Sequence, residues 1–169
     1  MYHLFSRGSD RRRIFDKYGD YADFMDLFST YAVKFELECF AWALMPNHWH
    51  LVVRSPARGL SDFVKRLNHR HSLRSNRRKG RTAHLFQNRF GSVLQQSDPQ
   101  FLWTVRYVLR NPVAAGLCDT VAQWQWSSYQ ATVQAVTGPR FLRSGELLGY
   151  FGGSLEQQIA AFNAHLEDR

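Results

Sequence analysis

Apolar residues in the first third of the chain form three runs that predict β-strands. Residues 2–7, YHLFSR, have strand propensity and are followed by a Gly-Ser-Asp turn. Residues 36–45, ELECFAWALM, are apolar and aromatic enough for a central strand, which the turn at Pro46-Asn47 would end. The next strand is predicted directly after this turn, at residues 48–54, HWHLVVR.

Helical spacing of apolar residues indicates two helices next to these strands. A stripe of aromatic and aliphatic residues recurs every three or four positions from Asp20 to Phe35, which is typical of an amphipathic helix. Ser61 can cap a second helix, whose Phe63 and Leu67 would face the core. The outer face of this second helix is strongly basic.

A third helix is predicted in the second half of the chain. Asp98 and Pro99 suit an N-cap and a first helical position, and the apolar pattern continues to about Arg110. A proline disfavours the helical conformation in the residue before it, so Asn111, which precedes Pro112, is expected to mark the helix boundary.

The order strand, helix, strand, strand, helix, strand, helix predicts an α+β fold, in which residues 86–95 form the fourth strand. We expect a ferredoxin-like antiparallel sheet with helices on one face. A short helix is expected near WQWSSYQATV, and Ser154 with Gln157 forms a capping box for a final helix. Because 169 residues are too few for two ordinary domains, we predict one domain at residues 1–130 with residues 131–169 as a helical extension packed on it.

Positive charge is concentrated in one region of the chain. The formal net charge is +8, but residues 54–90 contain eleven Lys and Arg against one acid, Asp62, so that this region carries +10 and the rest −2. A smaller cluster stands at residues 11–13. Such concentrated charge is typical of proteins that bind a polyanion, and nucleic acid is favoured over an anionic membrane surface. A solvated helix face is the alternative interpretation.

Several classes of protein are disfavoured by what the sequence lacks. Cys39 and Cys118 form no C-x-x-C pair, so neither a disulfide framework nor a thiolate zinc site is indicated, and a reducing compartment fits. The first residues lack the apolar stretch of a signal peptide, and the longest apolar run, CFAWALM, is too short to span a membrane. Secretion and membrane insertion are therefore not expected.

Two histidines in the predicted strand at residues 48–54 are candidate metal ligands. Successive side chains of a strand alternate between its faces, so His48 and His50 point the same way while Trp49 points the other way. This spacing offers two neutral nitrogen ligands to one metal ion. By itself His-x-His is a weak signal, because histidines that are solvated or satisfied within the core are common.

The third helix offers a candidate nucleophile. Tyr107 and Asn111 are four residues apart, which places them on one face of a helix. The Asn111 oxygen could complete a metal site, and a metal ion near the Tyr107 hydroxyl could activate a phosphate for attack. Taken alone, a tyrosine at this position is more often a half-buried helix aromatic than a nucleophile.

The chain contains three motifs in the order MPNHWHLVV, FQNRF and RYVLRNPVAAGL. In these motifs and their order it resembles the REP-associated tyrosine transposases, a branch of the single-tyrosine HUH transposases. YHLFSRG at the start and WSSY near Trp126 extend the resemblance over most of residues 2–130. It implies a metal-dependent single-stranded DNA endonuclease and strand transferase that acts on hairpin-flanked repeats through a 5′-phosphotyrosine intermediate. Motif by motif, it implies Tyr107 as the nucleophile and His48, His50 and Asn111 as ligands of a divalent metal, Mg²⁺ or Mn²⁺.

The resemblance also implies a DNA partner and a cellular location. The partner would be single-stranded DNA with a hairpin, and the protein would be cytoplasmic and nucleoid-associated, with a monomer favoured and a dimer possible. The chain departs from the family at Ala114, where members often carry an arginine that would contact phosphate. This departure concerns substrate affinity more than the catalytic positions.

The remaining basic and aromatic residues are expected to bind the DNA strand. Arginine and lysine would contact phosphates and an exposed tryptophan could stack on bases. The candidates are Arg7, Arg11, Arg12, Arg13, Lys65, Arg66, Arg70, Arg74, Arg77, Arg78, Arg89 and Trp103. Two other functions are weighed against the transposase. One is an HUH replication initiator or relaxase, and the other is a binding module of this fold that grips single-stranded DNA or RNA without cutting it.

Overall fold

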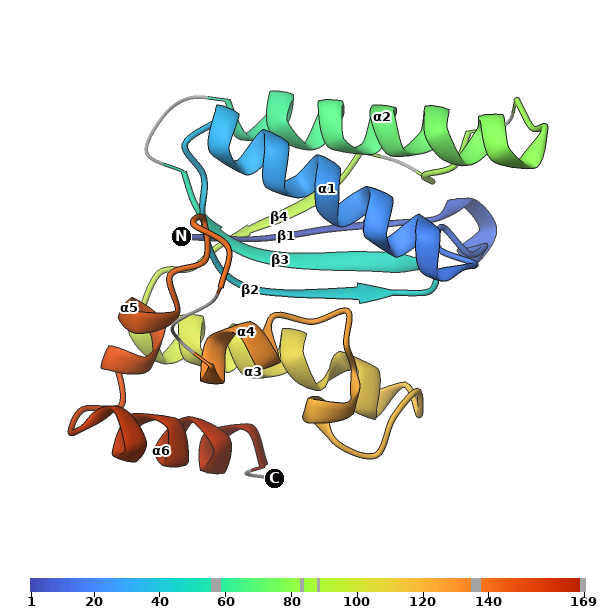
Figure 1. Ribbon diagram of the computed structural model, residues 1–169. Coiled ribbons are helices and arrows are strands. Elements are labelled where there is room, and N and C mark those ends of the chain that lie inside the picture. The colour runs from blue at the N-terminus through green and yellow to red at the C-terminus, as the bar shows by residue number, and fades with distance from the viewer. Residues whose placement is uncertain (56–58, 83, 88, 135–137, 168–169) are drawn as a thin grey trace.

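The computed structural model describes residues 1–55, 59–82, 84–87, 89–134 and 138–167 (Figure 1). Its strands and helices alternate in the first two thirds of the chain, and short helices follow. The elements are β1 (Tyr2–Arg7), η1 (Ser9–Arg11), α1 (Tyr18–Lys34), β2 (Glu38–Met45), β3 (His48–Arg54), α2 (Leu60–Lys79), β4 (Gly91–Leu94), α3 (Asp98–Ala114), η2 (Val121–Gln123), α4 (Tyr129–Val133), α5 (Ser144–Gly149) and α6 (Leu155–Glu167).

The four strands form one antiparallel sheet in the order β2-β3-β1-β4. This is the order that the succession β1-α1-β2-β3-α2-β4 gives in a ferredoxin-like fold, so the predicted α+β class and sheet are confirmed. Strand β1 lies between β3 and β4, with Phe5 opposite His50 and Arg7 opposite His48. The N-terminal strand therefore lies directly beside the strand that carries His48 and His50.

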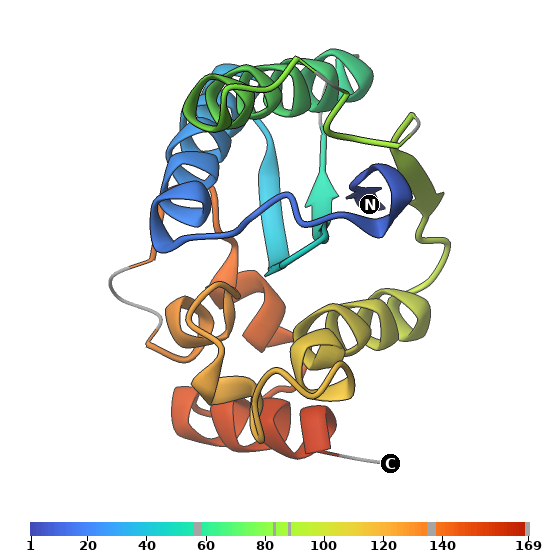
Figure 2. The same ribbon diagram turned by 90° about the vertical axis from the view of Figure 1, so that its right-hand side faces the viewer.

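The expectation of helices on one face of the sheet was wrong. Helices α1 and α2 cover one face, whereas α3 and the later helices cover the other, so that the sheet lies between two helical layers (Figures 1 and 2). Strand β2 is buried along almost its whole length, and its two faces contribute to two separate apolar cores. Trp49 and Leu51 belong to the core beneath α1 and α2, while Phe40 and Val52 belong to the core beneath α3. An apolar second face needs its own cover because exposure of these side chains to water is unfavourable.

Several predicted helix and strand boundaries differ from the structure. Helix α2 begins at Leu60 with Gly59 as its N-cap, so Ser61 lies inside the first turn and does not cap it. Ser97, rather than Asp98, caps α3 by accepting a hydrogen bond from the Gln100 amide. The fourth strand is shorter than residues 86–95: it spans Gly91–Leu94 at the edge of the sheet beside β1, and Phe86 forms an isolated bridge with Gly8.

Helix α3 continues past its proline. The predicted boundary at Asn111 was wrong, because the helix ends at Ala114 with Pro112 inside it. The carbonyls of Asn111 and Pro112 accept hydrogen bonds from the amides of Ala115 and Leu117, and Pro112 is buried. The final turn is thus satisfied and packed, which outweighs the proline's local preference. As a result Asn111 is held in regular helix rather than at a frayed end.

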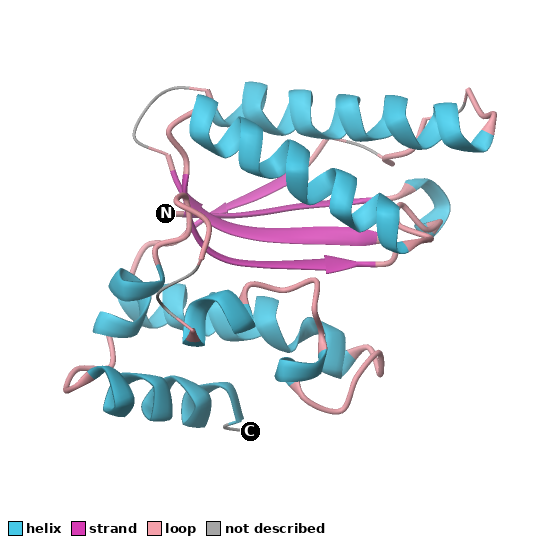
Figure 3. Ribbon diagram, in the orientation of Figure 1, coloured by secondary structure: helices cyan, strands magenta, loops and turns pink. Residues whose placement is uncertain are grey.

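The segment after α3 packs on that helix as short helices and loops (Figure 3). Phe162 of α6 lies in the core beneath α3, and the Arg110 guanidinium of α3 donates a 2.6 Å hydrogen bond to the Leu166 carbonyl. The capping box at the start of α6 is confirmed, because the Ser154 amide donates to Gln157 Oε1 and the Gln157 amide donates to Ser154 Oγ. None of the described helices combines the length and the apolarity that crossing a membrane requires.

Candidate active site

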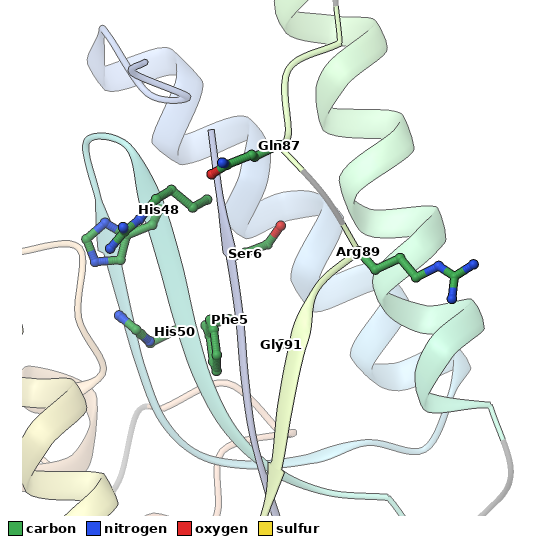
Figure 4. Close-up of a pocket in the computed structure, with 8 residues that line it drawn as sticks. Phe5, Ser6, His48, His50, Gln87, Arg89 and Gly91 are labelled. Atoms are coloured by element: carbon green, nitrogen blue, oxygen red, sulfur yellow. The ribbon is translucent and has the colours of Figure 1, made fainter. Parts of the chain in front are cut away.

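Side chains from β1, β3 and α3 meet on the face of the sheet that α3 covers. His48 and His50 stand on β3 and point the same way, as the strand alternation predicted. They line a pocket of about 300 Å³ together with Phe5 and Arg7 of β1 and with Gly91 of β4. Figure 4 shows this pocket, with the two imidazoles along one wall and Phe5 beside them. The pocket is open to a ligand from solution, whereas the opposite face of the sheet is a packed core.

His48 is fixed by a polar partner at each ring nitrogen. Its Nδ1 lies 2.6 Å from Asn47 Oδ1, and its Nε2 lies 3.2 Å from Asn111 Oδ1. Burial lowers the pKa of His48, the hydrogen bond with Asn111 opposes this change, and the nearby Arg7 charge adds to it. His48 is therefore expected to be neutral at pH 7, with one N–H proton for its two nitrogens.

The two contacts of His48 indicate which nitrogen carries the proton. An amide oxygen can only accept, so the shorter contact requires that Nδ1 donate to Asn47, which leaves Nε2 with a bare lone pair facing Asn111. Two acceptors that face each other need a cation between them or a rotated Asn111 amide that donates from Nδ2. In both arrangements Nε2 is unprotonated, which is the state that a metal ligand needs.

His50 has a partner that the sequence analysis did not identify. Its Nδ1 lies 2.9 Å from Nε2 of His3 on β1, and its own Nε2 is buried without a hydrogen-bond partner among the described residues. Burial, followed by the charges of His48, His3 and Arg7, lowers the pKa of His50 well below its usual value. Burial also lowers the pKa of His3 to about 4. The alternation of β1, which places His3 on the same face as Phe5 and Arg7, was the signal that could have found it.

The predicted nucleophile lies beside the second histidine. The Tyr107 ring stands 5.6 Å from the His50 ring, centroid to centroid, and 42% of the tyrosine is exposed. Trp103, one helical turn earlier, stacks on Tyr107 with a centroid distance of 5.6 Å and an angle of 7° between the rings. The structure thus brings His48, His50, Tyr107 and Asn111 together in one site, as the sequence analysis expected of their geometry.

The side chains of this site can hold a divalent cation. No cluster of three or more His, Cys, Asp or Glu side chains that could hold a metal ion occurs in the part of the chain that the structure describes. The candidate set is different, because it has two imidazole nitrogens and one amide oxygen. Neighbouring ligands of an octahedral ion, each at about 2.1 Å, lie about 3 Å apart, and the 3.2 Å between His48 Nε2 and Asn111 Oδ1 is close to this separation. The unpartnered Nε2 of His50 would supply a further ligand.

Some of the predicted DNA-binding residues lie near the site. Arg7 lines the histidine pocket. Arg11, Arg12 and Arg13 are exposed on the loop after β1, which is attached to the turn before His48 because the Asn47 Nδ2 donates to the Arg11 carbonyl. Of these four arginines only Arg7 lines the pocket, and Arg12 and Arg13 form ion pairs with Asp10 and Asp16.

The predicted residues of α2 are not brought to the histidines, since α2 packs on the opposite face of the sheet. Arg74 is paired with Asp23 and Asp26 of α1, and Arg78 with Asp20 and Asp23. The other predicted α2 positions are exposed to solvent, namely Lys65, Arg66, Arg70 and Arg77. Lys65 lines a second cavity, of about 560 Å³, which it shares with Arg89, and Arg89 also lines the histidine pocket. In Figure 4 the Arg89 side chain extends away from the two histidines.

Two further arginines, which the sequence analysis did not select, lie next to Tyr107. Arg106 and Arg110 line a shallow cavity of about 220 Å³ on α3 together with Trp103, Tyr107, Asn111 and Ala114. Their spacing from one another, four residues on a helix, was a signal that could have found them. Ala114 lines the same cavity, so an arginine at this position would add charge here.

Comparisons with known proteins identify a family for this chain and agree with its fold. Residues 1–123 match the family model described as transposase IS200 like. A protein of Haemophilus influenzae named "Putative REP-associated tyrosine transposase" is 24% identical over 128 residues, which are 69% of this chain and 73% of that protein. A solved structure described as a REP-associated tyrosine transposase bound to a REP hairpin is similar with a TM-score of 0.65 and 18% identity, over 79% of each chain. At this identity the structural likeness establishes the shared fold.

Proposed function

The chain belongs to the IS200-like transposase family, and we propose that it cuts and rejoins single-stranded DNA beside a hairpin, with Tyr107 as the nucleophile. The observation that carries this proposal is the meeting of Tyr107 with His48, His50 and Asn111 on one face of the sheet. Arginines stand on both sides of this meeting point, Arg7 in the histidine pocket and Arg106 beside the tyrosine. A strand of DNA that lies across the site would therefore find positive charge before and after the reacting phosphate.

His48, His50 and Asn111 would hold a divalent metal, Mg²⁺ or Mn²⁺. When bound, such an ion would neutralise phosphate charge and polarise the scissile phosphodiester. The protein's own contribution is to keep both imidazoles neutral by burial, to leave His50 Nε2 without a hydrogen-bond partner among the described residues, and to hold Asn111 in regular helix beside them. The pocket also remains open, so that phosphate and water can reach the free ligand positions.

The chemical step follows from the position of Tyr107. The phenolic oxygen attacks phosphorus and loses its proton, a new bond between Tyr107 Oη and phosphorus forms, and the bond from phosphorus to the 3′-oxygen breaks. The departing 3′-oxygen takes up a proton and becomes a 3′-hydroxyl, while the 5′-phosphate stays on the tyrosine. Because the phosphotyrosine keeps the free energy of the phosphodiester, attack by another 3′-hydroxyl rejoins the strand without a nucleotide cofactor.

A hairpin as the substrate is supported by the relatives. The solved neighbour is described as bound to a REP hairpin, and the curated relative carries the REP-associated name. A chain of this fold needs no second subunit to assemble the four residues of the site, since all four come from one copy. We therefore favour a monomer that acts on one hairpin.

The proposal is tested by incubating the protein with labelled single-stranded hairpins from its own genomic flanks. Wild type should form a covalent protein–DNA adduct that survives denaturing gels, depends on Mg²⁺ or Mn²⁺ and disappears with chelator. Tyr107→Phe should bind the same hairpin with unchanged affinity and form no adduct, because only the nucleophilic oxygen is removed. His50→Ala should lose the metal-dependent reaction.

The second candidate is a binding module of this fold that grips DNA without cutting it. It would bind the hairpins but give no adduct with any divalent metal, and Tyr107→Phe would then equal wild type in every measurement. If an adduct forms in the Tyr107→Phe variant, cleavage remains but the nucleophile is another residue.

A further inference from the structure

Each of the two candidate metal-binding histidines has one hydrogen-bond partner at Nδ1. For His48 the partner is Asn47 Oδ1, at 2.6 Å, and for His50 it is Nε2 of His3, at 2.9 Å. An amide oxygen can only accept, so Asn47 leaves His48 with a single tautomer, in which Nδ1 carries the proton and Nε2 does not. The partner of His50 does not fix its tautomer in this way, because either ring of the His3–His50 pair could donate the hydrogen bond.

The surroundings of His50 favour one of these two arrangements. If His3 donated, His50 would carry its own proton on Nε2, and this N–H would be buried with no acceptor among the described residues. A buried donor without an acceptor is rare in folded proteins because its desolvation is not compensated. If His50 donates from Nδ1, its Nε2 keeps a free lone pair, which a metal ion can satisfy.

We propose that His3 is a positioning residue, which accepts the Nδ1–H of His50 and thereby holds the His50 Nε2 lone pair ready for the metal. The inference rests on the proposed function, since it assigns His50 as a ligand. Metal-binding histidines generally donate their second N–H to a carboxylate, a carbonyl or water, which orients the ring and increases its basicity. No acidic side chain takes this place among the hydrogen bonds of the described residues, and His3 fills it.

The location of His3 fits positioning better than direct contact with DNA or metal. It lies on β1 opposite Val52, next to the His50 strand, and only 9% of it is exposed. Its ring stacks on His50 at a centroid distance of 5.1 Å and an angle of 29°. Since its Nε2 is engaged with His50, that nitrogen is not free to act as a third ligand. Its ring also lies 6.0 Å from the Tyr107 ring, so the rings of His3, His50 and Tyr107 pack against one another.

The first test measures the tautomer directly in the metal-free, full-length protein. Long-range proton–nitrogen correlation spectra of ¹⁵N-histidine-labelled protein distinguish a protonated from an unprotonated ring nitrogen. Wild type should show His50 protonated at Nδ1 and bare at Nε2. A spectrum with the His50 proton on Nε2 would overturn the proposal, whatever the variants do.

The second test measures Mn²⁺ affinity by proton relaxation enhancement in the Tyr107→Phe background, where no adduct can form. His3→Phe keeps an aromatic ring but removes the acceptor, and it should weaken Mn²⁺ binding by about 10- to 100-fold, as loss of an outer-shell partner does. His3→Gln presents an amide oxygen and should recover most of the affinity. Circular dichroism melting of each variant controls for folding.

A third variant separates failure of this inference from failure of the proposed function. His50→Ala should lose more Mn²⁺ affinity than His3→Phe, because it removes a ligand. If His50→Ala and His48→Ala both bind Mn²⁺ as wild type does, the metal site itself is wrong. If they lose affinity while His3→Phe does not, or if His3→Gln is no better than His3→Phe, the metal site stands and the role of His3 is refuted.

Discussion

Helix α2 carries two pairs of arginines whose removal should have different consequences, although each pair carries the same charge. Arg70 and Arg77 are exposed and form no ion pair among the described residues, whereas Arg74 and Arg78 are paired with acids of α1. At about 100° per residue, Arg77 lies roughly 20° from Arg70 around the helix axis, so these two arginines share a face. Arg78 is rotated by roughly 80° from Arg70, toward the side that contacts α1. The double variants Arg70→Gln with Arg77→Gln, and Arg74→Gln with Arg78→Gln, remove the same net charge.

The exposed pair should change DNA affinity if α2 carries part of the DNA track. Each lost phosphate contact lowers the slope of log affinity against log salt by about 0.7 to 0.9, so that two contacts lower it by about 1.4 to 1.8. Between about 50 and about 200 mM salt, a fourfold change, the wild type should then lose about tenfold more affinity than the variant. The paired positions should leave the salt slope nearly unchanged, because their charge is already offset by Asp20, Asp23 and Asp26.

The paired positions should instead change stability. Asp20 is buried and keeps two backbone hydrogen bonds when Arg78 is lost, and the Arg78 side chain is itself 40% exposed, so the cost should be modest, about 1–2 kcal/mol. For a chain of this size that lowers Tm by roughly 3–6 °C. Hairpin binding by fluorescence anisotropy across salt, with thermal melts of the same samples, measures both effects. Equal salt slopes for both double variants would refute the division of α2 into a binding and a structural face.

Other substitutions probe the pocket and the core. Gly91→Ala should lower stability by about 1–3 kcal/mol in thermal melts, because its Cβ would come within 2.1 Å of the Phe5 ring, and Phe5→Leu should relieve part of this cost. The free energy of unfolding should fall as the pH drops from about 6.5 to about 4, because burial lowers the pKa of His71 to about 4 and the unfolded chain therefore binds that proton first. His71→Gln should flatten this fall, and an unchanged pH profile would contradict the argument. Trp103→Leu should slow adduct formation by Tyr107 at saturating hairpin more than it weakens hairpin binding, and the reverse result would make Trp103 a base-stacking platform instead.

The site is only partly visible in the sequence, because its two halves are joined by long-range contacts. The strand alternation and the helical spacing of four are local rules, and they were enough to place His48 with His50, and Tyr107 with Asn111, on common faces. Neither rule can state that the two faces meet, because that contact joins residues about sixty positions apart. Likewise, the charge run at residues 54–90 predicted a basic surface, but only the packing of α2 against α1 shows which arginines are neutralised.

The sequence by itself determined the strand and helix order, the antiparallel α+β class and the two half-sites, because short-range periodicity and turn residues encode them. The tertiary structure decided which faces of the sheet are covered, how far α3 runs beyond Pro112, and which side chain accepts from the second histidine. Apolar residues on both faces of β2 require a second helical layer, and that layer carries Tyr107 to the histidines. The pairing of β1 with β3 places His3 against His50, a contact that arises only when strands distant in the chain become neighbours.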